Sequence, residues 1–417
     1  MTDVSNLDGL FKDQFHSDIE DLKPQHVLLQ DLIDFVPADK QNGEFYSIPT
    51  LLRSNQGVTY LGESGSIGTL VSAKPGIMKE AQVYGSEINV RGQLSYKALS
   101  QAASAGSRAF KKASAWLVED LATVAHIRLE IAALYGRSGL GEIESYTNVS
   151  GTTYDVVIAE DSFAPGIWVS LEGAVLEVFN AGAKVGDRKL TVETVTTTTR
   201  TVRVTQSGST GTPAATHDLF FETANAGSGS FNEMCGLFAQ MSAVSGTLFN
   251  IDRGAYTLMQ GNVVASTGAA SKAKIVSAAM HAVDKGCMSE LVVLVGTKTW
   301  ADLNKEDMAL RRFDGSYNSS VSESGNTELV YSNVNGKIKV ICHPMVKNGH
   351  AFILNPKDIL WVGSAKPTFE IPGFSGEKFF RLVDGSNAVE LQNYSDLAIY
   401  AIKPSQTVLL TGITHAA

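Results

Sequence analysis

Apolar residues recur every three or four positions between Ser107 and Tyr135, the spacing of one face of an α-helix. The apolar positions are Phe110, Ala113, Leu117, Leu121, Val124, Ile127, Ile131 and Leu134. Ser107 is a suitable N-cap, Gly136 a suitable C-terminal stop, and no proline interrupts the stretch. The helix would be about 43 Å long. The pattern predicts a spine that organises the β elements on either side, with an ordinary amphipathic core helix as the alternative.

Before this helix, residues 44–99 read as a long β excursion around a glycine-rich tip. Glu44–Leu52 and Gln82–Leu99 are strand-like, and Asn55–Gly68 is rich in glycine and small polar residues. A two-stranded arm is marginally stable by itself, so we expect it to lie on a neighbouring subunit. The tip sequence GESGSIG lacks the spacing of a phosphate-binding loop.

After the helix, residues 146–230 are rich in Thr, Ser, Gly and Val. Strands are predicted at Ile167–Leu171, Val175–Phe179, Lys189–Val195 and Arg200–Thr205. Glycine-containing turns separate them. The segment predicts a small β barrel or sandwich inserted into the main fold.

Residues 262–345 predict a compact α/β unit. A helix is expected at Ser271–Lys285, a buried strand at Glu290–Val295, and a second helix near Thr299, capped by Thr299 with Asp302. Leu329–Ser332 and Lys337–Cys342 form the expected hairpin about Asn335–Gly336.

The C-terminal part again predicts β structure. The expected strands are Ala351–Leu354, Ile359–Val362, Phe379–Val383, Ala388–Gln392, Leu397–Ile402 and Thr407–Ile413. These strands need a core partner, and the long helix is the obvious one. The fold class is therefore α+β.

The composition narrows the function classes. The chain has 417 residues, 44% hydrophobic and 18% charged, so it is globular and poor in surface charge. The net charge of −9 gives no reason to expect tight binding to nucleic acid. Residues 1–40 carry much of this charge, and we expect an arm there with a short helix at Gln25–Asp34 that docks elsewhere. No stretch is apolar enough to span a membrane, and the first residues do not look like a signal peptide.

Candidate chemistry is sparse. The three cysteines are far apart and fit a reducing cytoplasm, with Cys235 and Cys342 interpreted as inert core thiols. His126 is interpreted as a packed or rim histidine, and His343 and His350 lack further ligands for a metal site. No catalytic, cofactor-binding or metal-binding residue is predicted.

Two further segments have weak functional alternatives. Leu291–Trp300 resembles a strand–glycine–helix step that could hold an anion, but it lacks further glycines. Residues 311–327, with Arg311, Arg312 and Glu323, are expected to form an intersubunit contact rather than a substrate site.

The order of elements, together with three local phrases, resembles the major capsid proteins of tailed double-stranded DNA bacteriophages, the Hong Kong ninety-seven fold. The phrases are INVRG at 88–92, GLFAQMSAVSGTLFNIDRGAY at 236–256 and GKIKVICHPMVKNGHAFILNP at 336–356. None of them is a catalytic signature.

The resemblance implies a phage capsid fold with seven named regions. These are an N-arm at 1–40, an E-loop at 41–95, the spine-helix part of the P-domain at 96–145, an inserted small β domain at 146–230, a P-domain connection at 231–261, an α/β A-domain at 262–345, and P-domain return strands at 346–417.

The implied function is structural, not enzymatic. Hexamers and pentamers of the chain would form an icosahedral head around double-stranded DNA, assembled in the host bacterial cytoplasm. Expected partners are copies of itself, a separate scaffolding protein, a portal, and decoration or cement proteins, with only weak non-specific DNA contact and no membrane. Some relatives crosslink Lys to Asn, for which Lys74 or Lys79 with Asn393 are the weak candidates here.

Alternatives remain open at this point. An encapsulin, a bacterial shell of the same fold around cargo enzymes, is the nearest. A nucleotide-binding enzyme built on residues 262–345, and a tail-tube or decoration protein, are more distant.

Overall fold

The computed structural model describes residues 27–36, 45–63, 68–97, 113–227, 230–311, 329–333, 336–370, 380–383 and 385–415. They divide into two compact units. The first unit includes Ile88–Ile127 and Pro367–Ser395, and the second includes His26–Glu87, Arg128–Lys366 and Asp396–Ala417.

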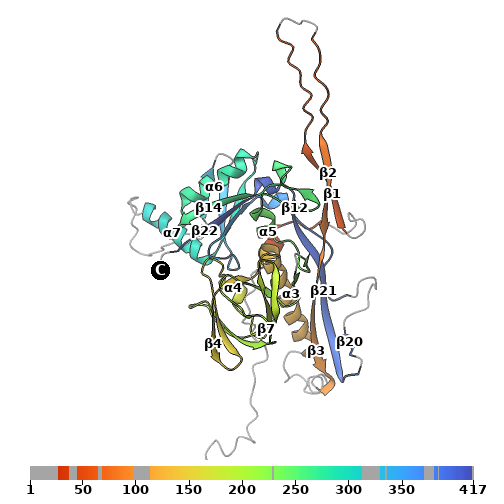
Figure 1. Cartoon of the computed structure of the whole chain (residues 1–417), viewed down its shortest axis with the longest axis vertical. Helices are drawn as coiled ribbons and strands as arrows, with labels where there is room; N and C mark the ends of the chain where they lie inside the picture. Colours follow the sequence, from red (N-terminus) through yellow and green to blue (C-terminus); the bar gives the residue numbers. More distant parts are fainter. Residues whose placement is uncertain are drawn as a thin grey trace, which may run out of the picture. The chain divides into compact units, whose positions relative to one another are not determined.

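A six-stranded mixed sheet forms one part of the second unit, in the order β14-β22-β18-β15-β17-β16. Figure 1 labels its strands β14 and β22. Its strands are β14 (Asn262–Gly268), β15 (Leu291–Val295), β16 (Leu329–Asn333), β17 (Gly336–Cys342), β18 (Ala351–Leu354) and β22 (Val408–Ile413). The β14–β22 and β15–β17 pairs are parallel and the other neighbours antiparallel. The sheet confirms the predicted α/β unit and its β16–β17 hairpin.

Two helices accompany this sheet. Helix α6 (Lys272–Asp284) confirms the helix predicted at Ser271–Lys285. Ser271 is its N-cap, and the Ser271 hydroxyl accepts a hydrogen bond from the Lys274 N–H. Helix α7 (Thr297–Arg311) begins earlier than predicted. Thr299 lies fully buried inside its first turn, so the expected capping pair with Asp302 is wrong.

Strands β18 and β22 lie inside the six-stranded sheet, and Ile353 and Val408 join its core cluster. The long helix was predicted as the core partner of the last strands, but one face of these two packs in the core of the six-stranded sheet instead. Phe352, the alternate neighbour on β18, contacts the Tyr135 ring at 5.7 Å between centroids. The strand is buried on both faces, which explains its continuous apolar sequence.

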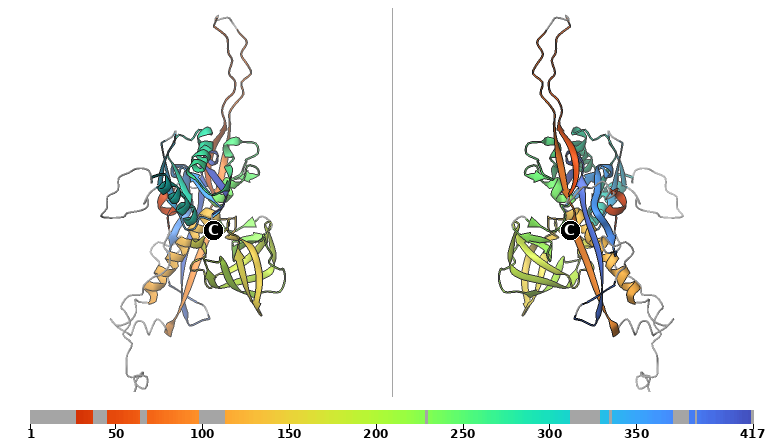
Figure 2. Two further views of the ribbon diagram at one scale, coloured as in Figure 1. Left: turned by 90° about the vertical axis from the view of Figure 1, so that its left-hand side faces the viewer. Right: turned by 90° about the vertical axis from the view of Figure 1, so that its right-hand side faces the viewer.

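A closed barrel follows the long helix in the second unit, in the order β4-β5-β8-β7-β6-β9 (Figure 2). Its strands are β4 (Gly141–Ser150), β5 (Thr153–Ile158), β6 (Val175–Asn180), β7 (Ala183–Thr196), β8 (Thr201–Ser207) and β9 (Asp218–Phe221). Alternate residues such as Val156 and Ile158 fill its interior. The barrel confirms the predicted β insertion.

One predicted strand of the insertion is wrong. Ile167–Leu171 contains the end of a short helix, α4 (Pro165–Trp168), with Pro165 in its first turn. Proline has a helical φ and lacks only an N–H that this position leaves unbonded, so it favours a helix start. Trp168 is fully buried there.

The long helix is α3 (Ala113–Tyr135), which confirms the predicted spine helix over those residues; Ser107–Lys112 lie outside the described residues. In the first unit, Leu117 and Leu121 of α3 pack with Leu391. In the second unit, residues 129–135 of α3 are buried on every side, including the non-predicted positions Leu129 and Ala133. The apolar face therefore widens toward the C-terminal end of the helix.

A further sheet contains β3 (Ser86–Ser95), β19 (Ile359–Thr368), β20 (Phe380–Leu382) and β21 (Ala388–Ala401). Its order is β19-β21-β20, and β3 also pairs with β21. Strand β21 is continuous where two strands were predicted, because the polar Asn393 and Ser395 are buried within it rather than exposed in a turn.

The arm is a hairpin of β1 (Phe45–Arg53) and β2 (Ile77–Tyr84). The single strand predicted at Gln82–Leu99 is interrupted at Gly85, where an added Cβ would clash with the Asp396 carboxylate. Helix α1 (Leu29–Leu32) is shorter than predicted.

Short elements complete the second unit. They are β10 (Asn225–Gly227), β11 (Ser230–Phe231), α5 (Leu237–Ser242), β12 (Thr247–Leu248), β13 (Ile251–Asp252), η4 (Thr257–Met259), η5 (Pro356–Asp358) and η6 (Pro404–Gln406). None of the helices in the described ranges is both long and apolar enough to cross a membrane.

The spine assignment predicts the effect of Leu121→Asp. Leu121 is 4% exposed, so the variant places an unpaired carboxylate in an apolar cluster. We expect the free energy of unfolding to fall by more than about 4 kcal/mol, so that little soluble subunit forms. Met288→Asp, at a side chain that is 78% exposed, is the matched control. Wild-type thermal unfolding of Leu121→Asp would contradict the assignment.

Candidate functional site

The most distinctive surface of the second unit is the arm tip, described at residues 54–63 and 68–76 between β1 and β2 (Figure 1). Large apolar side chains stand exposed along it. Their exposed fractions are 60% for Val58, 93% for Tyr60, 45% for Leu61, 73% for Leu70 and 51% for Val71. A row of exposed apolar side chains of this size is typical of an interaction site.

The root of the arm is fixed, in contrast. Leu52, Ala81 and Val83 are buried, and the Gln82 N–H donates to the Phe249 carbonyl at 3.0 Å. The Ser86 hydroxyl donates to the Asn232 carbonyl at 2.7 Å. The arm is thus held at its base and free of intrachain packing along the described tip.

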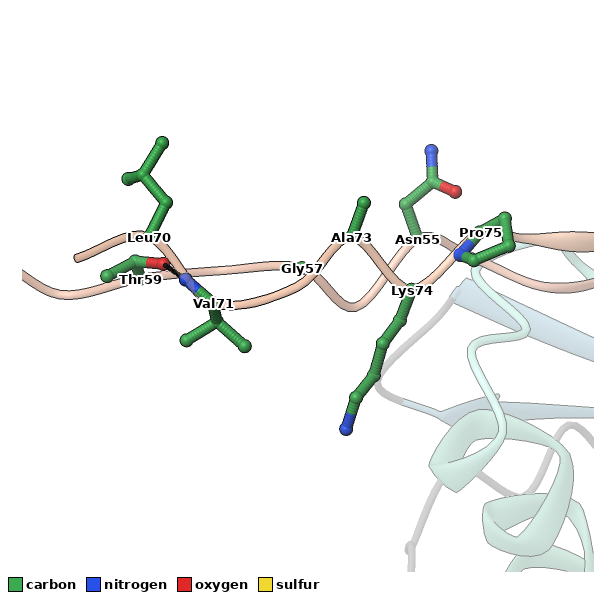
Figure 3. Close-up of a pocket in the computed structure, with 8 residues that line it drawn as sticks. All are labelled: Asn55, Gly57, Thr59, Leu70, Val71, Ala73, Lys74 and Pro75. Atoms are coloured by element: carbon green, nitrogen blue, oxygen red, sulfur yellow. Dashed lines mark hydrogen bonds between the residues drawn. The ribbon is translucent and has the colours of Figure 1, made fainter.

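Within the tip, residues of the two segments line a hollow of about 550 Å³, and Figure 3 shows these residues. The Val71 N–H donates to the Thr59 hydroxyl, not to a backbone carbonyl. Figure 3 shows Leu70 and Ala73 on one side of the ribbon and Val71 and Lys74 on the other. The tip therefore presents apolar groups on both faces, with no convergent polar groups that would hold a small ligand.

A buried polar cluster lies on α3, where sequence reasoning placed no functional residue. The Glu130 carboxylate is fully buried, and its Oε1 accepts from the Leu28 N–H at 2.9 Å and the Leu29 N–H at 2.6 Å. His343 Nε2 lies 2.9 Å from the same oxygen. Because His343 Nδ1 accepts from the Met345 N–H, Nε2 carries the proton and donates to Glu130.

Lys347 follows in the same loop and is also buried. Its Nζ donates to the Gly139 carbonyl at 3.0 Å and lies 4.4 Å from the Tyr135 ring centroid. Burial lowers the pKa of Lys347 to about 8, and nearby carboxylates such as Asp218 partly offset the shift. Burial likewise raises the pKa of Glu233 to about 7.

His350 ends this loop between aromatic rings. Its ring centroid lies 4.8 Å from that of Phe238 and 5.8 Å from that of Tyr135. Burial, with a further contribution from Lys347, lowers its pKa to about 3. The imidazole is therefore neutral in the folded chain at neutral pH.

Shifted pKa values often mark active sites, but this cluster has no access to a substrate. Glu130, His343 and Lys347 are at most 4% exposed, and their polar atoms are bonded within the chain. The described residues hold no group of three or more His, Cys, Asp or Glu that could bind a metal ion. The arrangement supports a structural role that joins residues 28–29, α3 and the loop 343–350.

Glu130 and Lys347 were missed because their partners are distant in sequence. The available signal was a carboxylate in the apolar stretch RLEIAALY, and a lysine in PMVKNG between two apolar strands. Charged residues in such places are normally paired.

The other singled-out residues do not converge on a site. Cys235 is half-buried. Cys342 is exposed, so its interpretation as a core thiol is wrong. Lys74 and Lys79 are exposed, whereas Asn393 is 1% exposed, so its amide is shielded from an incoming lysine. His126 is half-buried, and residues 312–328 lie outside the described residues.

The chain is similar to known capsid proteins. Residues 216–403 match the family model described as SU10 major capsid protein. The solved capsid asymmetric unit of cyanophage A-1(L) covers 99% of this chain and 100% of its own length, at 10% identity and a TM-score of 0.60. The capsid protein of the native GTA particle aligns with 99% of this chain over 98% of its own length, at 8% identity and a TM-score of 0.54. No curated protein matches the sequence.

These findings confirm the predicted fold, a mixed α and β phage-capsid architecture. At such low identity the solved structures establish the fold only, and the family model adds the sequence pattern of a major capsid protein over residues 216–403.

The Glu130 cluster predicts a graded loss of stability. Glu130→Ala leaves two buried N–H groups and a histidine without their acceptor and should cost about 3–5 kcal/mol. Glu130→Gln keeps one acceptor oxygen and should cost about 1.5–3 kcal/mol. The exposed Glu172→Gln is the control, with a change within about 0.5 kcal/mol. Equal stability of all three in urea unfolding would disprove the structural role.

His350 predicts a contribution to acid sensitivity. Its folded pKa lies below the unfolded value, so the unfolded chain binds more protons and stability falls as pH drops from 6.5 to about 3. His350→Phe removes this term. The stability difference between wild type and variant should change by about 1.4 kcal/mol per pH unit in that window and stay constant above pH 7.5. A difference independent of pH between 4 and 6 would contradict the assignment.

Proposed function

We propose that this chain, a tailed-phage major capsid protein, assembles as hexamers and pentamers into an icosahedral head that encloses double-stranded DNA. The match of residues 216–403 to a major capsid protein family carries the proposal. The capsid fold over 99% of the chain supports it. The family match also favours a phage head over an encapsulin shell.

The exposed arm tip supplies the physical basis for assembly. Side chains such as Tyr60 and Leu70 gain their burial only on another copy, at about 25 cal/mol per Å² of apolar area removed from water. Because the same patch on each copy meets a different patch on the next, the contact is heterologous, and it closes into rings when the rotation permits.

The regional roles belong to the proposal. Residues 1–40 act as the N-arm, 41–95 as the E-loop, 96–145 and 346–417 as the P-domain joined through 231–261, 262–345 as the A-domain, and 146–230 as an inserted β domain. In this scheme β18 and β22 complete the A-domain sheet although their residues fall in the 346–417 segment.

The partners are also proposed. A scaffolding protein, a portal, and decoration or cement proteins would act with the chain, and assembly would take place in the host bacterial cytoplasm. The packaged DNA would make only weak, non-specific contact, which fits the net charge of −9. No enzymatic step is assigned, since the titratable cluster of Glu130 and Lys347 is closed to substrates.

Assembly is tested by light scattering and negative-stain electron microscopy of the purified chain with and without a scaffolding protein. Wild type should form closed shells or rings. Leu70→Ser combined with Val71→Ser should reduce shell yield at least tenfold, because both side chains are more than half exposed and apolar, while the thermal midpoint stays unchanged. Val149→Ser, on a barrel strand and 48% exposed, is the matched control.

Small monodisperse wild-type particles under all these conditions would overturn the proposal. Shells that consistently enclose a cargo protein and no DNA would favour the encapsulin alternative.

A further inference from the structure

Helix α6 lies beside strand β14, which is the edge strand of the six-stranded sheet (Figure 1). A groove between the two is lined by residues of both elements. Two hollows of about 440 and 390 Å³ adjoin along it and share Val264 and Ala265. Helix α6 contributes Lys274, Ser277 and His281, and its C-cap residue Lys285 follows. The steps of three or four residues place them on one face. The groove therefore has a strand as one wall and a helix face as the other.

The strand wall has an open backbone edge. Among the described residues, β14 pairs only with β22, so its other edge has no partner strand. At one end Lys274 Nζ donates to the carbonyls of Thr267 and Ala269. The edge is thus free over Asn262–Ser266, and free edges readily add another strand.

A second observation indicates that the groove takes a ligand. The Ser266 hydroxyl is buried, with the residue only 5% exposed, and it has no hydrogen-bond partner in the described chain. It lines the hollow beside Ala265 and Ser277. An unbonded buried hydroxyl costs free energy that an incoming peptide group would recover.

The helix wall is basic toward its C-terminal end. His281 is exposed and Lys285 is half-buried. Burial lowers the pKa of Lys285, so a carboxylate beside it would stabilise the charged form. The two positions are one helical turn apart, about 6 Å along the axis.

The chain contains a segment with the complementary spacing. Ser17–Leu22 reads SDIEDL. In an extended strand, residues two apart such as Asp18 and Glu20 would share one side at a spacing of about 6.7 Å. This spacing matches that of His281 and Lys285 to within about 1 Å.

We propose that Ser17–Leu22 of a second copy binds in the α6–β14 groove as an added strand, with Asp18 and Glu20 facing His281 and Lys285. The inference rests on the proposed function only in requiring that two copies meet. It assigns the acidic N-terminal segment a specific docking surface on the neighbouring chain.

The test uses full-length chains with a photoreactive amino acid in place of Glu20. After irradiation of a mixture of ¹⁵N-labelled and unlabelled copies, crosslinks should map to residues 262–285 and join a labelled to an unlabelled copy. Ser277→Trp fills the groove and Lys285→Glu reverses its charge, so each should lower the crosslink yield at least fivefold.

Matched controls are Ala301→Trp and Lys305→Glu, at exposed positions of α7 on the same unit, which should leave the yield unchanged. Crosslinks confined to one copy, crosslinks elsewhere, or a yield insensitive to Ser277→Trp would overturn the inference. Shell formation is scored separately by light scattering. Loss of shells with the crosslink intact would count against the proposed function alone.

Discussion

The carboxylate of Glu130 is the interaction on which much of the second unit depends. One oxygen accepts from two backbone N–H groups near the start of the described chain and from His343. A buried carboxylate is unfavourable unless such donors surround it. Moving any donor segment away would leave the buried charge without a hydrogen bond, so each segment is held in place. The result is a rigid junction between segments that lie about a hundred or more residues apart in sequence.

The loop 343–350 extends this junction. Its Lys347 is buried and its His350 is half-buried beside Tyr135. Desolvation lowers the pKa of both side chains. The arm tip contrasts with this junction, because its apolar side chains are exposed to solvent and its described residues make few backbone hydrogen bonds. Stability is therefore concentrated at the junction, while the capacity for association is concentrated where the chain is least packed.

Much of this organisation could be predicted from sequence, because periodicity reports local structure. The spacing of Leu117, Leu121 and Ile131 predicted α3, and the Thr- and Val-rich turns predicted the barrel. Errors arose where tertiary context decides: Thr299 is buried rather than a cap, and β22 completes a distant sheet. The pairing of Glu130 with His343 spans 213 residues, a separation that local pattern cannot encode.

The barrel has a consequence of another kind. Its first and last strands are neighbours, since Gly141 pairs with Leu219, so the chain enters and leaves the barrel at nearly the same place. Closure leaves no edge strand to be satisfied elsewhere. Such a module can be exchanged, enlarged or lost without displacing the flanking framework. For engineering, its adjacent entry and exit make it a natural place to graft a foreign domain.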